Sequence, residues 1–204
     1  MKIHKMQQLS PEWWEARRGI PTASAFDRIL TPTGRPSAQA DDYMNELVAD
    51  TISLEPNFFS DRPMTRAMEI GRETEPEARR WYQMTYPDHQ VYQVGLCLTD
   101  DGSIGCSPDF LVGDEGVGEL KCCLLKTHIG YLRKGVLPTE YRPQVHGHLL
   151  VTGRKWCDFV SYAIGAPPLV VRVVPDEYTE LLRKEVGRFV EAYKRTLDMI
   201  RGMA

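Results

Sequence analysis

The sequence lacks any apolar run as long as the ~18–20 residues that a membrane-spanning helix needs. Its first residues also lack the apolar core of a secretory signal, so we expect a cytoplasmic protein with no membrane association. No internal repeat or low-complexity tract is visible. The chain has 204 residues, 42% hydrophobic and 26% charged, which is enough for one sizeable core. We therefore expect a single domain over 1–204.

A basic excess is also absent, since the net charge is −3 and the isoelectric point is near 6.0. Simple high-affinity nucleic-acid binders usually carry an excess of Lys and Arg, so this class is disfavoured. A nuclease is not excluded, because its active site needs acids and its bases can be local. The candidate local bases are Arg17, Arg18, Lys126, Arg133, Lys134, Arg142, Arg154 and Lys155.

Cysteines are few, and their number, five, is odd. They are Cys97, Cys106, Cys122, Cys123 and Cys157, with no Cys-x-x-Cys spacing among them. This pattern disfavours a disulfide framework, a zinc site and a thiol redox module. We expect reduced and mostly buried thiols.

The stretch 106–124 has the pattern of an antiparallel hairpin. Apolar residues flank the loop 113–118, which contains three glycines and two acids. Pairing would bring Asp109 near Glu119. Residues two apart on a strand share a face, so Glu119 and Lys121 would point the same way.

Two carboxylates and an ammonium would thus converge on one spot. A divalent cation relieves the repulsion between two carboxylates, and hard oxygen ligands suit magnesium or manganese. The spacing alone leaves two plainer interpretations open. Glu-Leu-Lys is common on solvated strands, and Ser-Pro-Asp is common in turns.

The spacing Asp109-x9-Glu119-x-Lys121 resembles the PD-(D/E)XK nuclease motif. Cys-Ser-Pro-Asp before the loop and Glu-Leu-Lys-Cys after it resemble the phage lambda exonuclease type, the viral alkaline recombination exonucleases. Three further segments, 16–24, 71–79 and 141–145, are similar to that family's Arg-x-Gly-x-x-Thr-Ala-Ser, Gly-x-x-x-Glu-x-x-Ala-Arg and Tyr-x-x-Gln-Val segments, in the same order.

The resemblance implies an α/β, restriction-endonuclease-like core, with a mixed central sheet flanked by helices on both faces. The order of predicted elements agrees with such a fold. Asp109 would be the bridging metal ligand, Glu119 the second and the Leu120 carbonyl a third. Lys121 would position or deprotonate the attacking water, or neutralise transition-state charge.

The resemblance also assigns roles to residues outside the hairpin. Glu75 would be a further metal-associated carboxylate, although a helix-cap charge explains it equally, because Glu75 precedes Pro76 at an expected helix start. Gln144 and Tyr141 would position water or phosphate. His146 and His148 do not form a zinc pair, since residues two apart on a helix diverge.

Arg17, Ser24 and Ser107 are the candidates for binding DNA phosphate. A guanidinium and a hydroxyl near a helix start suit an anion. Two alternatives stay open: Arg17 pairs with Glu12 or Glu15 on the surface, and Ser24 is only a cap. For Trp13, core packing is favoured over base stacking.

By resemblance, the chain is a magnesium-dependent exonuclease, with manganese as a possible substitute and two ions per site. It would digest one strand of linear double-stranded DNA from the 5′ end, leaving a 3′ overhang. Family members form toroidal trimers and work with a single-strand annealing protein. The alternatives are an endonuclease or repair nuclease on the same fold, or a catalytically silent DNA-end-binding protein.

The remaining pattern predicts further elements. Helices are expected over 10–18, 22–30, 38–54, 65–71, 76–85, 124–134 and 139–151 and from 176 onward, and strands over 90–98, 155–162 and 169–174. Phe58 and Phe59 are candidates for a satellite core, a DNA wedge or a subunit contact.

Overall fold

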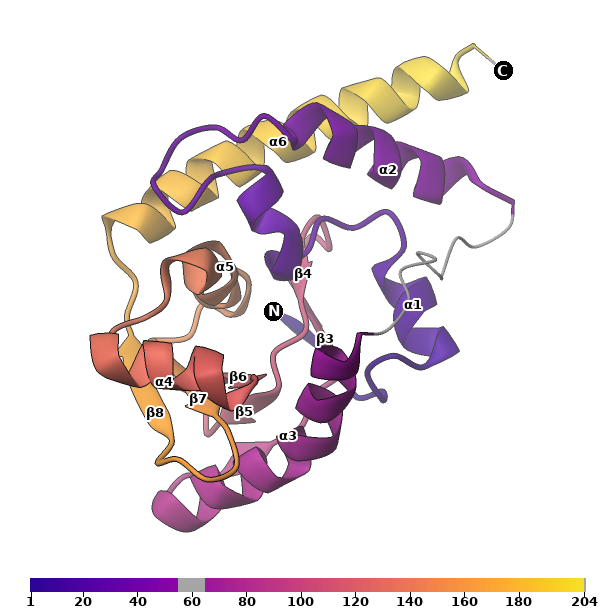
Figure 1. The fold of residues 1–204 in the computed structure, drawn as a ribbon. Helices are drawn as coiled ribbons and strands as arrows, with labels where there is room; N and C mark the ends of the chain where they lie inside the picture. The colour runs from indigo at the N-terminus through magenta and orange to yellow at the C-terminus, as the bar shows by residue number, and fades with distance from the viewer. Residues whose placement is uncertain (55–64, 204) are drawn as a thin grey trace.

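A computed structural model describes residues 1–54 and 65–203 (Figure 1). Its helices are α1 (Pro11–Arg17), α2 (Ala40–Ile52), α3 (Arg66–Thr85), α4 (Leu125–Lys134), α5 (Arg142–Thr152) and α6 (Glu177–Arg201), with 3₁₀ helices η1 (Ala23–Arg28) and η2 (Thr139–Tyr141). Its strands are β1 (Lys2–His4), β2 (Val91–Tyr92), β3 (Leu96–Leu98), β4 (Gly105–Cys106), β5 (Phe110–Val112), β6 (Gly116–Cys122), β7 (Trp156–Tyr162) and β8 (Leu169–Val173).

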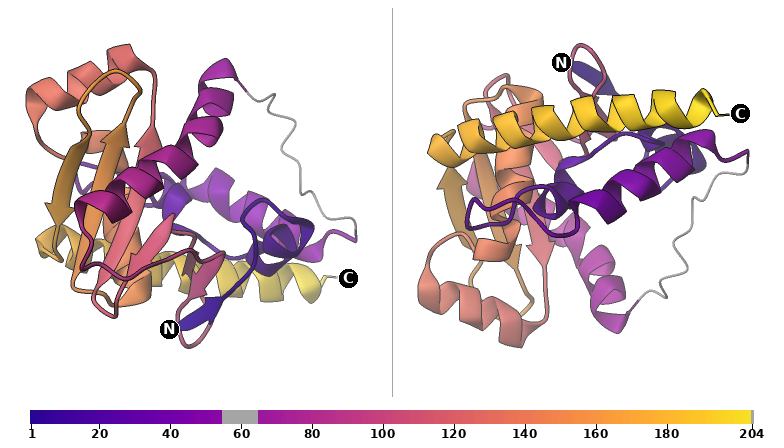
Figure 2. Two further views of the ribbon diagram at one scale, coloured as in Figure 1. Left: turned by 90° about the horizontal axis from the view of Figure 1, so that it is seen from below. Right: turned by 90° about the horizontal axis from the view of Figure 1, so that it is seen from above.

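The larger sheet has the order β2-β5-β6-β7-β8 and is mixed, with only β6 and β7 parallel. Helix α3 packs on one face, where Ala78 and Tyr82 are buried against Phe110. Helix α5 packs on the other face through Val145 and Leu149, and α6 covers α5 and α2 (Figures 1 and 2). The predicted α/β fold with helices on both faces is confirmed.

The predicted hairpin is present as β5 and β6, with Phe110 opposite Gly118. Glycine is required at 118, because a Cβ there would lie 2.1 Å from Cζ of Phe110. Gly113 has a φ of 46°, which suits the turn. The close packing of Phe110 over Gly118 fixes the register that brings Asp109 beside the strand carrying Glu119.

Two predicted boundaries are wrong around Pro76. The segments 65–71 and 76–85 form one continuous helix, α3, with Pro76 inside it. Pro76 lies on the exposed side, while Ala78 and Tyr82 bury the opposite face, so packing outweighs one lost backbone hydrogen bond. Glu75 therefore lies within a helix, and its interpretation as a charge at a helix start is wrong.

The predicted strand 90–98 is also wrong. It divides into β2, which pairs with β5, and β3, which joins a separate sheet of order β1-β3-β4. The change occurs at Gly95, whose Cβ would lie 2.4 Å from the Met6 backbone oxygen. The close passage of the N-terminal segment across Gly95 separates the two sheets.

The segment 22–30 contains the 3₁₀ helix Ala23–Arg28 rather than an α-helix. Phe58 and Phe59 lie outside the described residues. Within residues 1–54 and 65–203, no helix is both long and apolar enough to span a bilayer. Cys97, Cys106 and Cys157 are buried, as expected.

A buried polar cluster attaches α3 to the sheet. The Tyr82 hydroxyl donates to Asp158 Oδ2 at 2.7 Å, and Arg172 donates to both Asp158 oxygens at 2.8 Å. Asp158 is fully buried, so each of these donors offsets part of the cost of a buried carboxylate. The cluster holds the helix that carries Glu75.

We expect Tyr82→Phe to lose about 1–2 kcal/mol of unfolding free energy, because one buried carboxylate oxygen loses a donor. Tyr86→Phe, which removes a hydroxyl one turn further along, should stay within ~0.5 kcal/mol of wild type. Urea unfolding compares the two. Equal losses would show that the Tyr82 hydroxyl contributes nothing specific.

Candidate active site

Asp109 stands where the β5–β6 ladder ends. Its backbone N–H donates to the Gly118 carbonyl at 3.1 Å, and its Oδ2 accepts from the Leu120 N–H at 2.5 Å. The ladder ends at the Phe110–Gly118 pair, so the Leu120 peptide lies beyond the end of β5. The N–H and C=O of one strand residue face the same side, which places the Leu120 carbonyl on the edge that Asp109 occupies.

Glu119 is the most enclosed acid of this group, with 3% of its surface exposed. Its Oε1 accepts from Lys121 Nζ at 2.5 Å and from Gln144 Nε2 at 2.6 Å. Its Oε2 lies 2.7 Å from His148 Nε2. Strand β6 and helix α5 therefore meet on one carboxylate.

The Lys121 ammonium lies between Glu119 and an aromatic ring. It sits 4.9 Å from the centroid of Tyr141, within the range of a cation–π contact. Burial lowers the pKa of Lys121, but the charges of Glu119 and Asp109 outweigh burial and raise it above its ordinary value. Lys121 is accordingly protonated at neutral pH.

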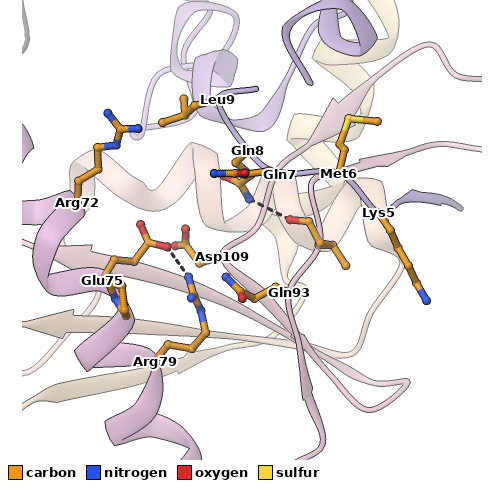
Figure 3. A pocket seen from close by; sticks show the side chains of 12 residues that line it. Lys5, Met6, Gln7, Gln8, Leu9, Arg72, Glu75, Arg79, Gln93 and Asp109 are labelled. Atoms are coloured by element: carbon orange, nitrogen blue, oxygen red, sulfur yellow. Dashed lines mark hydrogen bonds and ion pairs between the residues drawn. The ribbon is translucent and has the colours of Figure 1, made fainter. Parts of the chain in front are cut away.

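Glu75 approaches Asp109 from α3. Figure 3 shows the two carboxylates facing the same pocket, with Arg79 paired to Glu75 from one turn along the helix. Arg79 is mostly enclosed, with 13% of its side chain exposed, so the ion pair fixes the direction of Glu75. Glu75, Ala78 and Tyr82 all lie in α3, at the three- and four-residue spacing that places residues on one helix face.

The two hairpin carboxyls have opposite pKa shifts. Burial, followed by the charges of Glu119 and Glu75, raises the pKa of Asp109 well above its ordinary value. Burial would raise the pKa of Glu119 too, but Lys121 and His148 outweigh it and lower that pKa to about 2. Repulsion among three acids is thus concentrated on Asp109.

Arg17 is held by hydroxyl groups. It donates to Ser107 Oγ at 3.2 Å, to Thr22 Oγ1 at 2.8 Å and to Ser24 Oγ at 3.4 Å. Its guanidinium carbon lies 4.1 Å from the centroid of Trp13, whose indole N–H also donates to Ser107 at 3.0 Å. The predicted phosphate residues Arg17, Ser24 and Ser107 are therefore brought together.

Arg17 forms no ion pair with any residue in the described ranges, so the interpretation as a surface pair with Glu12 or Glu15 is wrong. Glu15 instead pairs with Arg18, at 3.7 Å. Burial lowers the pKa of Arg17 to about 10, which still leaves it charged at neutral pH. An enclosed cation whose partners are neutral hydroxyls is suited to an anion.

Three cavities meet at these groups. The Arg17 cavity, of about 360 Å³, is lined by Gln8, Trp13, Trp14, Arg17, Ser24, Ser107, Asp109, Glu119, Lys121, Gln144 and His148. The N-terminal cavity, of about 580 Å³, adjoins it at Asp109 and contains Glu75 (Figure 3). The Tyr141 cavity, of about 430 Å³, adjoins both, at Lys121 and at Glu75.

The donor set fits a divalent cation. Asp109 and Glu75 line the same cavity, and the Leu120 peptide lies beside Asp109, so all three can offer hard oxygens. Burial, followed by the charges of Glu119 and Glu75, raises the pKa of Asp109, and a cation would compensate that charge. Within residues 1–54 and 65–203, no group of three or more His, Cys, Asp or Glu side chains is already arranged as a metal site. Both Glu119 oxygens instead contact Lys121, Gln144 and His148.

Residues 12–155 match the model of the YqaJ-like viral recombinase domain. The chain belongs to the YqaJ-like viral recombinase family. No curated protein sequence matches it.

Solved structures agree with this family. The alkaline exonuclease LHK-Exo from Laribacter hongkongensis is 30% identical, with a TM-score of 0.82, covering 95% of this chain and 97% of its own. Its complex with dAMP gives a TM-score of 0.81 over the same shares. A phage-related exonuclease from Haemophilus somnus 129PT, 12% identical with a TM-score of 0.63, shares the fold over 94% of this chain and 99% of its own. The resemblance drawn from the sequence motifs is confirmed, and the family supports a nuclease.

Several residues of this recombinase-family site were not found from the sequence. His148 contacts Glu119, Trp13 supports Arg17 and Ser107, and Thr22 accepts from Arg17. The i, i+4 spacing of Gln144 and His148 was the one available signal, because it places both on the same helix face. Contacts between Trp13 and Ser107, 94 residues apart, leave no local trace.

Asp109→Asn should raise the melting temperature of the metal-free protein at pH 8. A carboxyl whose folded pKa is raised destabilises the fold once pH exceeds its unfolded pKa near 3.8, and asparagine removes that cost. The gain should shrink as pH falls toward 4. Magnesium should stabilise wild type by mass action and leave the variant nearly unchanged.

Thermal melts in EDTA and in magnesium test this, with the exposed turn variant Asp114→Asn as control. A lower melting temperature of Asp109→Asn at pH 8 in EDTA would contradict the assignment.

Proposed function

We propose that this chain is a 5′→3′ exonuclease that degrades one strand of linear double-stranded DNA and leaves a 3′ overhang for recombination by strand annealing. One nuclease domain over 1–204 carries the activity. It uses magnesium, with manganese as a substitute and two ions per site. Asp109, Glu119, Glu75 and the Leu120 carbonyl would hold the ions.

The observation that carries the proposal is the Arg17 cavity. It joins an enclosed guanidinium without a carboxylate partner to Asp109, Glu119 and Lys121 in one continuous space. An endonuclease cleaves within a DNA strand, so it does not need a site for a terminal phosphate beside its catalytic residues. A catalytically silent end-binding protein does not need Asp109, Glu119 and Lys121 arranged together.

The ions would polarise the scissile phosphate and the attacking water. Lys121, kept protonated by its two acidic neighbours, neutralises charge in the transition state, which favours this role over that of a base. Gln144 and His148 contact the Glu119 carboxylate and fix its orientation. Tyr141 keeps the Lys121 ammonium at the phosphate by lying against it.

A net charge of −3 gives little general attraction to DNA. We infer that encirclement compensates, as a toroidal trimer around the duplex. A single-strand annealing protein would then take up the exposed 3′ strand. Such a protein would act on DNA in the cytoplasm of the host cell.

Digestion of a linear duplex labelled separately at each strand end tests the activity. With magnesium, we expect 5′ labels to be released first and the 3′-ended strand to persist, while covalently closed circles stay intact. Cleaved circles would favour an endonuclease. Binding of ends without digestion would favour a silent end-binding protein.

Arg17→Ala should lose most of the preference for 5′-phosphorylated over 5′-hydroxyl duplex. A charge-assisted contact contributes about 1.5–3 kcal/mol, or roughly ten- to a hundredfold in rate. The ratio of initial rates on the two substrates is the measurement, since it cancels differences in folded protein. Arg28→Ala is the control, because Arg28 is paired with Glu46 and does not line the Arg17 cavity. An unchanged ratio in Arg17→Ala would remove the phosphate assignment.

A further inference from the structure

Leu9 has a backbone conformation that leucine rarely adopts. Its φ is 67°, and within residues 1–54 and 65–203 it is the only non-glycine residue with a positive φ. Its side chain is also 46% exposed. Glycine or asparagine would adopt this conformation with less strain, and neither would expose an apolar side chain. Packing within the fold therefore does not account for a leucine at this position.

The segment Lys5 to Leu9, here called the arm, is fixed in place. Gln8 Nε2 donates to the Val94 carbonyl at 3.1 Å and to the Pro108 carbonyl at 2.9 Å. Pro108 directly precedes Asp109, so the arm is attached to the backbone that carries the central carboxylate. The strain at Leu9 is thus maintained by its surroundings, as is common at functional sites.

The arm forms one wall of the N-terminal cavity, opposite Glu75 and Arg79. Figure 3 shows Leu9 near Arg72 at one end of this cavity and Lys5 at the other. Lys5 is exposed and forms no ion pair within the described part of the chain. A volume of about 580 Å³ is ample for a nucleotide.

We propose that the N-terminal cavity is a second DNA subsite, which takes the nucleotide on the 3′ side of the scissile phosphate. Leu9 packs against its sugar and base, and Lys5 neutralises its phosphate. The proposal rests on the proposed exonuclease function. With the terminal phosphate at Arg17 and the scissile phosphate at Asp109, the strand must leave on the other side of Asp109.

The Tyr141 cavity is the rival route for the strand. Arg72 lines both cavities and does not distinguish them. The N-terminal cavity adds Lys5, which has no ion pair in the described part of the chain, and Arg79, which is paired with Glu75. Glu75 also lines both cavities, and the cation that the Tyr141 cavity adds, Lys121, is paired with Glu119. Lys5 is therefore the cation that distinguishes the two cavities. Charge complementarity to a phosphodiester favours the N-terminal cavity.

Leu9→Ala and Leu9→Asn test the apolar contact on 5′-phosphorylated linear duplex. We expect KM to rise about tenfold, equivalent to ~1.4 kcal/mol, with kcat little changed. The melting temperature of Leu9→Asn should equal or exceed that of wild type, because asparagine tolerates the left-handed conformation. The matched control is Leu124→Ala, since Leu124 is also 46% exposed but lines the rival cavity.

Lys5→Gln tests the charge without requiring catalysis. Fluorescence anisotropy of labelled duplex in EDTA gives binding constants over a range of salt concentrations. Loss of one phosphate contact should reduce the slope of log K against log salt by about 1. Lys2→Gln, an exposed lysine in β1 outside the cavity, should leave the slope unchanged.

Three results would overturn the subsite: unchanged KM in both Leu9 variants, a raised KM in Leu124→Ala instead, or a KM increase in Leu9→Asn accompanied by a lower melting temperature. The last result would show a structural role. A wild-type chain that does not digest linear duplex would refute the proposed function rather than the subsite. The anisotropy comparison of Lys5→Gln with Lys2→Gln would then decide whether the cavity contacts DNA.

Discussion

The site depends on how one enclosed carboxylate is satisfied. Glu119 is almost fully buried, and a buried carboxylate is costly unless donors surround it. Lys121 comes from the same strand, whereas Gln144 and His148 come from α5. The need to solvate Glu119 from within therefore fixes α5 against β6.

Asp109, in contrast to Glu119, has few donors and several acidic neighbours. Its nearest donor is the Leu120 N–H, while Glu119 and Glu75 add negative charge beside it. The negative charge of Glu119 is therefore compensated by its donors, whereas the negative charge around Asp109 is not. A divalent cation suits this arrangement, because Lys121 pairs with Glu119 and Arg79 with Glu75, and a cation would compensate the negative charge that remains at Asp109.

The functional residues outside the hairpin are held in place by buried polar contacts. Asp158, Tyr82 and Arg172 hold α3 on the sheet, and the same helix face then carries Glu75 to the site. On the opposite side, Trp13 and Ser107 hold Arg17 beside the segment between β4 and β5 that carries Asp109. Each functional group thus stands on an element whose position is set by a buried polar contact, which is how a site gains precision.

The sequence by itself determined the hairpin and the approach of Asp109, Glu119 and Lys121 to one another. Local turn chemistry and the two-residue period of a strand are sufficient for that. It also indicated the family, through motifs in a fixed order.

Tertiary structure decided the rest: the continuity of α3 through Pro76, the separation of β2 from β3, and the partners of Glu119. Each depends on contacts between segments distant in the chain: Tyr82 with Asp158, Met6 with Gly95 and His148 with Glu119. Burial energy and the solvation of buried charge act only when such segments meet, so no local pattern records them.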